Sequence, residues 1–186
     1  MYINIHQPLI DRCLENDKES QFSIYKLYYR SMYNTSLRIV NKTDDAEDIM
    51  QESFLTAFQK LATYKSEVSF GTWLKRIVIN RSLDYLRKRR VEFEEVTSEI
   101  PVFEEERENE PEYSVDEIKH AISQLSDGYR TILSLILLEG YDHEEVSEIL
   151  GINNVTSRTQ FSRAKQHLRT YLIENRMQQL TMQHYG

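Results

Sequence analysis

The chain has 186 residues and a formal net charge of −7, which comes from 23 Lys and Arg against 30 Asp and Glu. This length allows one domain or two small ones. No apolar run is long enough to cross a membrane and the start lacks the segments of a signal peptide, so we expect a cytoplasmic protein that is not embedded in a membrane. A single cysteine, Cys13, excludes an internal disulfide and a zinc site built from cysteines.

The net charge hides two basic segments that are separated by an acidic one. Residues 92–117 contain twelve acids and one base, a net charge of −11, which leaves +4 for the rest of the chain. Residues 75–90 contain seven bases and one acid, a net charge of +6. This distribution is compatible with nucleic-acid binding in spite of the acidic total.

Aromatic and apolar residues recur every three or four positions in the N-terminal part, which is typical of one face of a helix. We predict that the following residues lie in a helical core: Phe22, Tyr25, Tyr28, Tyr29, Met32, Tyr33, Leu37 and Val40. Asn41 is expected to end this helix in the left-handed conformation.

A second, acidic helix is predicted to begin near Thr43 or Asp44, with Asp44 and Glu47 as a capping box. Acids in a first turn stabilise the helix dipole, and the surplus at Asp48 and Glu52 suits a face that binds a partner. Paired carboxylates could instead serve acid catalysis or bind a metal. These would face solvent on one helix with no histidine nearby, so we expect neither.

A mobile loop is predicted from Tyr64 to Thr72, and a basic helix follows it. Basic residues beside aromatic ones suit nucleic-acid binding, because the basic side chains can contact phosphates and the aromatic rings can stack on an unpaired nucleobase. The alternative is that Trp73 packs in the core and that the basic run 87–90 is a solvated helix end that complements the dipole. We expect the core for Trp73 and nucleic acid for the bases, because they are too many for capping alone.

The acidic stretch after this helix contains Pro101 and Pro111 and has no sustained helical period. This composition predicts a flexible linker that repels itself. Its simplest role is that of a spacer. A second hypothesis is that it mimics nucleic acid and occupies a basic channel until DNA arrives.

The C-terminal part predicts a helix-turn-helix. Ser126 is a candidate N-cap for a largely buried helix, which Gly140 is expected to end. Asp142 and Glu145 form a predicted capping box for the second helix, and Gly151 makes the tight turn before the third.

The third helix, capped by Asn153 or Asn154, combines an apolar stripe with a basic one. The apolar stripe is Phe161, Ala164, Leu168 and Leu172, and the opposite stripe is Arg158, Ser162, Lys165 and Arg169, with Arg163 nearby. Such a helix can enter a major groove, where Arg can contact guanine and Gln160 could pair with adenine. The alternative is a solvated basic face on an ordinary helical hairpin.

These patterns predict an all-α protein with two small helical domains joined by a flexible acidic linker, the C-terminal domain being the helix-turn-helix. We place the N-terminal domain at residues 1–91, the linker at 92–114 and the C-terminal domain at 115–186. An enzyme is not expected, because His120 and His143 lack the spacing of metal ligands and the sequence has no Gly-rich phosphate loop or nucleophile setting. We therefore assign no catalytic residue, metal or cofactor.

Three segments resemble the extracytoplasmic-function sigma factors, the smallest members of the bacterial sigma family, and they occur in the family's order. Residues 45–58 (DAEDIMQESFLTAF) resemble the family's signature helix, and residues 70–87 resemble its promoter-melting segment. Residues 125–169 resemble its C-terminal helix-turn-helix. One such segment alone would be unspecific, whereas three in order around an acidic linker are highly specific.

The resemblance implies a factor that binds core RNA polymerase and directs promoter-specific transcription initiation without catalytic chemistry. The polymerase contacts that it implies are Asp45, Asp48, Gln51 and Glu52. The contacts that it implies with single-stranded −10 DNA, including a flipped base, are Tyr64, Phe70, Arg76, Asn80, Arg81, Asp84, Arg87 and Lys88. The contacts that it implies with duplex −35 DNA are Thr156, Arg158, Thr159, Gln160, Ser162, Arg163, Lys165 and Arg169.

The resemblance also implies an anti-sigma partner that clamps the two domains, and it implies no small-molecule substrate. Val155 stands where the family often has glycine, and Asp142 and Glu144 make the second helix more acidic, so weaker phosphate contacts are expected there. The leading alternative is a stand-alone helix-turn-helix regulator whose N-terminal domain senses a ligand or dimerises. A third reading is a helical adaptor that does not bind DNA.

Overall fold

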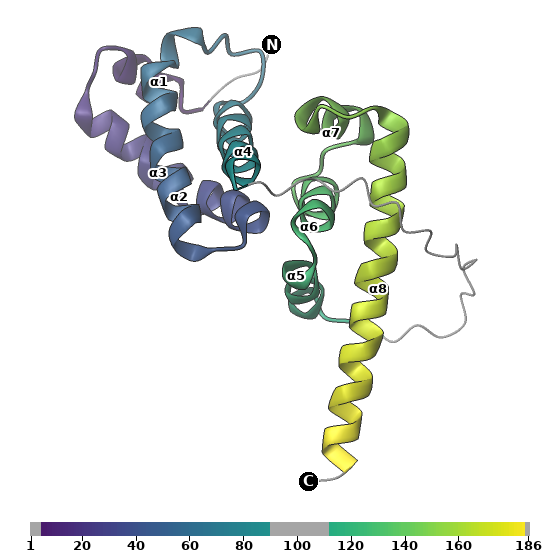
Figure 1. Ribbon diagram of the computed structural model, residues 1–186. Helices are drawn as coiled ribbons and strands as arrows, with labels where there is room; N and C mark the ends of the chain where they lie inside the picture. Colours follow the sequence, from purple (N-terminus) through teal and green to yellow (C-terminus); the bar gives the residue numbers. More distant parts are fainter. Residues whose placement is uncertain (1–4, 90–111, 185–186) are drawn as a thin grey trace. The chain divides into compact units, whose positions relative to one another are not determined.

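The computed structural model describes residues 5–89 and 112–184, and every regular element within these ranges is helical (Figure 1). The chain divides into two compact units, Met1–Arg90 and Val91–Gly186. The predicted all-α class with two small helical domains is therefore confirmed. The predicted acidic linker lies almost entirely outside the described residues.

The N-terminal unit packs three long helices against one another. It contains α1 (Gln7–Leu14), α2 (Lys18–Val40), α3 (Thr43–Gln59), the short 3-10 helix η1 (Leu61–Thr63) and α4 (Phe70–Lys88). Each of α2, α3 and α4 contacts the other two, and Ile24, Phe70 and Leu74 are buried in the core that they enclose. This packing holds α3 and α4 side by side, which positions the candidate site.

A side-chain cap and a left-handed residue define the two ends of α2. Asp17 caps its start, because the carboxylate accepts a hydrogen bond from the backbone N–H of Ser20 at 3.1 Å. Asn41 ends it with φ 55°, the left-handed conformation predicted from the sequence.

Two local predictions for this unit are wrong. The capping box of Asp44 and Glu47 does not form, because α3 begins at Thr43 and its N-cap is Lys42, which makes no side-chain capping bond. The aromatic stripe of α2 is not wholly in the core, since Phe22 is 59 % exposed and Tyr29 is 44 % exposed. The predicted helical period is correct, but some of the aromatic residues lie outside the face of α2 that α3 and α4 cover.

The start of α4 lies inside the segment predicted to be a loop. Ser69 caps the helix by accepting a hydrogen bond from the backbone N–H of Thr72 at 3.0 Å, so the helix begins at Phe70. Gly71 lies against the ring of Tyr28, and a Cβ at this position would be 2.9 Å from the Tyr28 Cε1 atom. The glycine therefore permits the close approach of the first turn of α4 to α2.

The C-terminal unit arranges short helices along one long helix (Figure 1). It contains α5 (Val115–Gln124), α6 (Asp127–Leu133), the π-helix η2 (Ser134–Leu138), α7 (His143–Leu150) and α8 (Asn154–His184). Each of α5, α6 and α7 packs against α8, around buried Ile132, Val146 and Ala164. The long helix therefore provides the surface on which the other helices of this unit pack.

The predicted helix-turn-helix is confirmed in α7 and α8. Asp142 accepts a hydrogen bond from the backbone N–H of Glu145 at 2.9 Å, and the Glu145 carboxylate accepts one from Asp142 in return. Gly151 makes the turn with φ 71°. Asn153 rather than Asn154 caps α8, because its side chain accepts from the backbone N–H of Thr156 at 2.7 Å.

The preceding helix pair follows the sequence less closely. Ser126 is the N-cap of α6, as predicted, but its side chain makes no capping bond. Gly140 has φ 81° and ends the segment as expected. Leu137, which lies in the segment predicted to be a largely buried helix, is 49 % exposed on the π-helix η2. Among the described residues, no helix combines the length and the hydropathy that crossing a bilayer requires.

Candidate functional site

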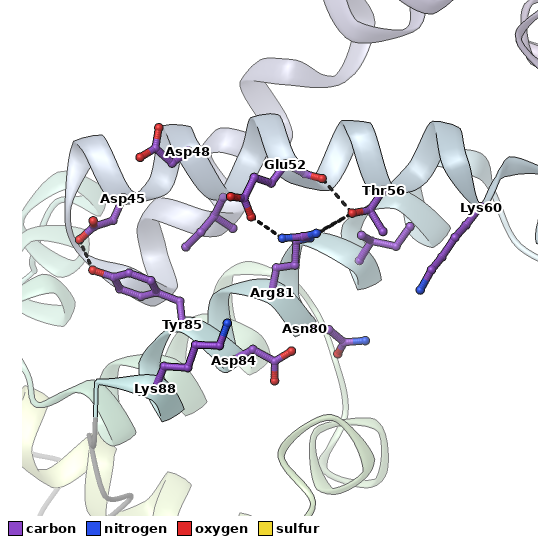
Figure 2. Close-up of a pocket in the computed structure, with 12 residues that line it drawn as sticks. Asp45, Asp48, Glu52, Thr56, Lys60, Asn80, Arg81, Asp84, Tyr85 and Lys88 are labelled. Carbon is purple, nitrogen blue, oxygen red and sulfur yellow. Dashed lines mark hydrogen bonds and ion pairs between the residues drawn. The ribbon is translucent and has the colours of Figure 1, made fainter. Parts of the chain in front are cut away.

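A groove of about 610 Å³ runs between α3 and α4 (Figure 2). Its walls consist of Asp45, Asp48, Ile49, Glu52, Thr56 and Lys60 on the side of α3, and Ile77, Asn80, Arg81, Asp84, Tyr85 and Lys88 on that of α4. The sequence had assigned the acids of α3 to polymerase and the polar residues of α4 to DNA. The structure brings members of both sets together along one groove.

Arg81 crosses this groove and joins the two walls (Figure 2). Its Nη1 atom donates to the carboxylate of Glu52, while Nε and Nη2 donate to the Thr56 hydroxyl oxygen at 3.2 and 2.7 Å. Arg81 was predicted as a DNA contact and Glu52 as a polymerase contact. Their ion pair shows that the two predicted surfaces adjoin, and that a residue of one neutralises a residue of the other.

A second contact joins the same walls near the start of α3. The Tyr85 hydroxyl donates to the Asp45 carboxylate, and Arg89 Nη1 lies 4.0 Å from the same carboxylate. Burial and this hydrogen bond raise the pKa of Tyr85, so the phenol stays protonated and keeps donating. Tyr85 and Thr56 were not among the predicted site residues, because nothing in the local sequence shows that they face α3.

The remaining polar candidates of α4 follow one exposed stripe. Arg76, Asn80, Asp84 and Arg87 recur at intervals of three and four and are all exposed. The Arg87 guanidinium pairs with Asp84 at 3.1 Å. This stripe therefore offers amide, carboxylate and guanidinium groups to a ligand beside the groove.

The two aromatic candidates lie at the other end of α4. Phe70 is 1 % exposed and belongs to the core, so the burial of its ring argues against the predicted contact with DNA. Tyr64 packs edge-on against it, with ring centroids 5.6 Å apart, and donates its hydroxyl hydrogen to the Val68 carbonyl at 2.7 Å. Tyr64 is half buried, so part of its ring remains accessible in the loop.

Gln51 is the one predicted polymerase contact that does not line the groove. It is exposed on α3 and its amide donates to Glu47 at 3.3 Å. Asp48 is exposed too, at the mouth of the groove. The four predicted residues of α3 thus extend from the groove onto the outer face of the helix.

The candidates of the C-terminal unit lie along one side of α8. Arg158, Thr159, Ser162, Lys165 and Arg169 are exposed, and Thr156, Gln160 and Arg163 are half buried. Successive residues of an α-helix are about 100° apart, so seven of the candidates lie within about 100° of Thr159, and Lys165 lies about 120° from it. The candidates therefore centre on one side of α8, where five of the eight are exposed.

Contacts within α8 hold two of these bases. Arg158 Nε donates to the Asn154 side chain at 2.8 Å, and the Lys165 ammonium lies 5.3 Å from the centroid of the Phe161 ring. No acid occurs between residues 150 and 173, so the basic charge of this face is not offset along the helix. The arrangement suits a polyanion such as duplex DNA.

The helix that precedes the turn fixes α8 through a histidine whose role the sequence did not suggest. His143 Nδ1 lies 3.1 Å from the buried hydroxyl of Ser157, and its ring meets that of Phe161 edge-on at 5.3 Å. His143 and Ser157 are separated by a turn and fourteen positions. Only the three-dimensional packing of α7 on α8 brings them together.

Comparisons with known proteins match both units. The chain matches the family Sigma-70 region 2 over residues 24–92 and the family Sigma-70, region 4 over residues 116–168. It is 30 % identical over 173 residues to the RNA polymerase sigma-H factor of Pseudomonas aeruginosa, covering 86 % of this chain and 90 % of that one. It is 29 % identical over 177 residues to the ECF RNA polymerase sigma factor SigW of Bacillus subtilis, covering 88 % and 94 %.

Solved structures share the fold. The sigma factor RpoE of Bartonella quintana, in complex with the anti-sigma factor NepR, aligns with a TM-score of 0.56 at 23 % identity, over 81 % of this chain and 94 % of that chain. CnrH, in complex with the cytosolic domain of CnrY, aligns with a TM-score of 0.54 at 16 % identity, over 89 % and 96 %. At these identities the likeness concerns the fold.

Proposed function

The chain belongs to the extracytoplasmic-function sigma factors, and from this premise we propose which surfaces perform promoter-specific initiation. A member of this family binds core RNA polymerase and directs it to promoters. We assign the N-terminal unit to polymerase and the −10 element, and the C-terminal unit to the −35 element. The boundaries 1–91, 92–114 and 115–186 remain predictions of the sequence.

The groove between α3 and α4 carries this proposal. Its α3 wall supplies Asp45, Asp48 and Glu52, which with exposed Gln51 form the proposed polymerase surface. Carboxylates of this kind attract a basic partner surface and fix its register. The opposite wall and the exposed stripe of α4 would face the unpaired −10 strand.

The proposed −10 surface contains Tyr64 in the loop and the polar and basic residues of α4. Its members are Tyr64, Arg76, Asn80, Arg81, Asp84, Arg87 and Lys88. The Lys and Arg side chains neutralise phosphates. Asn80 and Asp84 have the hydrogen-bonding groups to read the edge of an unstacked nucleobase. We exclude Phe70, which supports this surface from the core.

The proposed −35 surface is the uncovered half of α8. Arg158 and Arg163 have the planar, forked guanidinium that contacts a guanine edge, and Lys165 and Arg169 suit phosphates farther along the major groove of the DNA. We further propose an anti-sigma partner, a cytoplasmic location beside polymerase and DNA, and no catalytic activity. The anti-sigma proposal is supported by the complex recorded for RpoE of Bartonella quintana.

A charge reversal on α3 tests the polymerase surface. Asp48→Lys is expected to weaken association with bacterial core polymerase about tenfold or more, because it places like charges together. Glu15→Lys, the same charge change at an exposed position after α1, is the matched control and is expected to bind normally. Affinity is measured by titration with labelled protein, and thermal melting checks that both variants fold.

Two results would overturn the proposal. Normal holoenzyme formation by Asp48→Lys would reject the α3 surface. Failure of the wild-type protein to associate with core polymerase, together with tight binding to duplex DNA alone, would support the stand-alone regulator.

A further inference from the structure

The guanidinium of Arg81 donates hydrogen bonds to two side chains of α3, those of Thr56 and Glu52. Its Nε and Nη2 atoms both donate to the Thr56 hydroxyl oxygen, at 3.2 and 2.7 Å, and Nη1 donates to Glu52. Arg81 and Thr56 are 25 positions apart on different helices. A residue of α3 therefore orients the guanidinium of a residue on α4.

The hydrogen-bonding capacity of the Thr56 hydroxyl is used in full. Its own hydrogen is donated to the backbone carbonyl of Glu52 at 2.9 Å, one turn earlier in α3. This bond directs the two lone pairs of the oxygen away from the helix, where they receive Nε and Nη2 of Arg81. Valine has the same shape but neither the donor nor the lone pairs, and serine keeps both.

The two partners of Arg81 hold it in different ways. Glu52 is 61 % exposed, so its ion pair with Arg81 is screened by solvent and its carboxylate is accessible to a partner protein. Thr56 is half buried and contacts the side edge of the guanidinium. Arg81, itself 37 % exposed, keeps one further N–H on each of Nη1 and Nη2 for a ligand in the groove.

We propose that Thr56 is a positioning residue for DNA binding: it holds the Arg81 guanidinium so that its end edge faces the −10 strand. The proposal rests on the proposed function, in which Arg81 contacts that strand. An oriented guanidinium loses less conformational freedom when it binds a phosphate than a free one does, which favours binding. Thr56 itself does not contact DNA in this arrangement.

The test uses holoenzyme reconstituted with full-length protein and a labelled single-stranded oligonucleotide that carries the −10 element. Thr56→Val is expected to weaken binding about two- to tenfold, the equivalent of one ordinary hydrogen bond, while Thr56→Ser binds as the wild type does. Arg81→Ala is expected to weaken binding at least as much. In the Arg81→Ala background, Thr56→Val is expected to have no further effect, because the group that it positions is gone.

Each other outcome has a definite meaning. An effect of Thr56→Val that persists without Arg81 would indicate a merely structural role and overturn the proposal, as would unchanged binding by Thr56→Val when Arg81→Ala is impaired. Unchanged binding by Arg81→Ala would reject Arg81 as a DNA contact and the positioning role with it, while leaving the sigma function intact. Failure of the wild-type protein to form holoenzyme would instead reject the proposed function. Holoenzyme formation by every variant is measured in parallel, and thermal melting of each variant identifies a folding defect separately.

Discussion

The two units present their candidate residues in opposite ways. In the N-terminal unit, side chains from α3 and α4 bond to each other across a groove, as Arg81 does with Glu52 and Thr56. In the C-terminal unit, the candidates lie along α8 alone, and Arg158 donates a hydrogen bond to Asn154 of the same helix. A substitution of a residue that joins the two helices, such as Arg81, therefore alters two proposed surfaces at once, whereas one on α8 alters a single surface.

Core substitutions are expected to give the largest effects and to stay within their own unit. Phe70→Ala should cost the N-terminal unit about 3–5 kcal/mol of unfolding free energy, because it removes a fully buried ring. Leu133→Ala should cost the C-terminal unit about 2–5 kcal/mol for the same reason. Hydrogen exchange followed by mass spectrometry reports on both units in one sample. Loss of protection in α8 after Phe70→Ala would contradict the division into separately stable units.

Substitutions on α8 are expected to affect DNA without affecting stability. Arg158→Ala or Arg163→Ala should each cost about 1–3 kcal/mol at a matched −35 site, measured by holoenzyme binding to duplex promoter DNA. Binding to a −10 oligonucleotide should not change, in contrast to substitutions in the groove. Arg176→Ala removes a basic side chain from the same helix beyond Arg169, the last candidate contact, and is the matched control. Equal losses in all three variants would mean that α8 contributes only general positive charge.

The helix-turn-helix was predictable because its determinants are local. The capping box of Asp142 and Glu145 and the left-handed turn at Gly151 involve residues close together in sequence, and both are confirmed. The same reasoning produced one error: an acid at Asp44 resembles a cap, but α3 begins one residue before it. Capping patterns locate a helix end to within a residue or two, and the backbone decides between neighbours.

The groove could not be predicted, since its contacts join distant parts of the chain. Arg81 and Thr56 are 25 positions apart, and Tyr85 and Asp45 are 40 apart. Residue type predicts one acidic surface on α3 and one largely basic surface on α4. Only packing shows that the two surfaces meet, and it also removes Phe70 from the ligand surface by burying it.

Acid titration should have the smallest effect, and it compares one cap in each unit. The hydrogen bond from the Ser20 side chain lowers the pKa of Asp17 below 3.8, and hydrogen bonds from the backbone and side chain of Ser114 lower the pKa of Glu117 below 4.5. Because the folded values lie below the unfolded ones, each carboxylate stabilises its unit fully above the unfolded pKa, and this stabilisation is lost as pH falls through the folded pKa. We expect unfolding midpoints in urea to decline below about pH 4.5 for the C-terminal unit and below about pH 3.8 for the N-terminal unit.

Two substitutions test this expectation. Asp17→Asn should reduce the slope of the urea midpoint against pH in the N-terminal unit alone, and Glu117→Gln should reduce it in the C-terminal unit alone, since each amide retains the shape of the carboxylate without its charge. Unchanged slopes in both variants would show that other carboxylates govern the acid sensitivity of the two units.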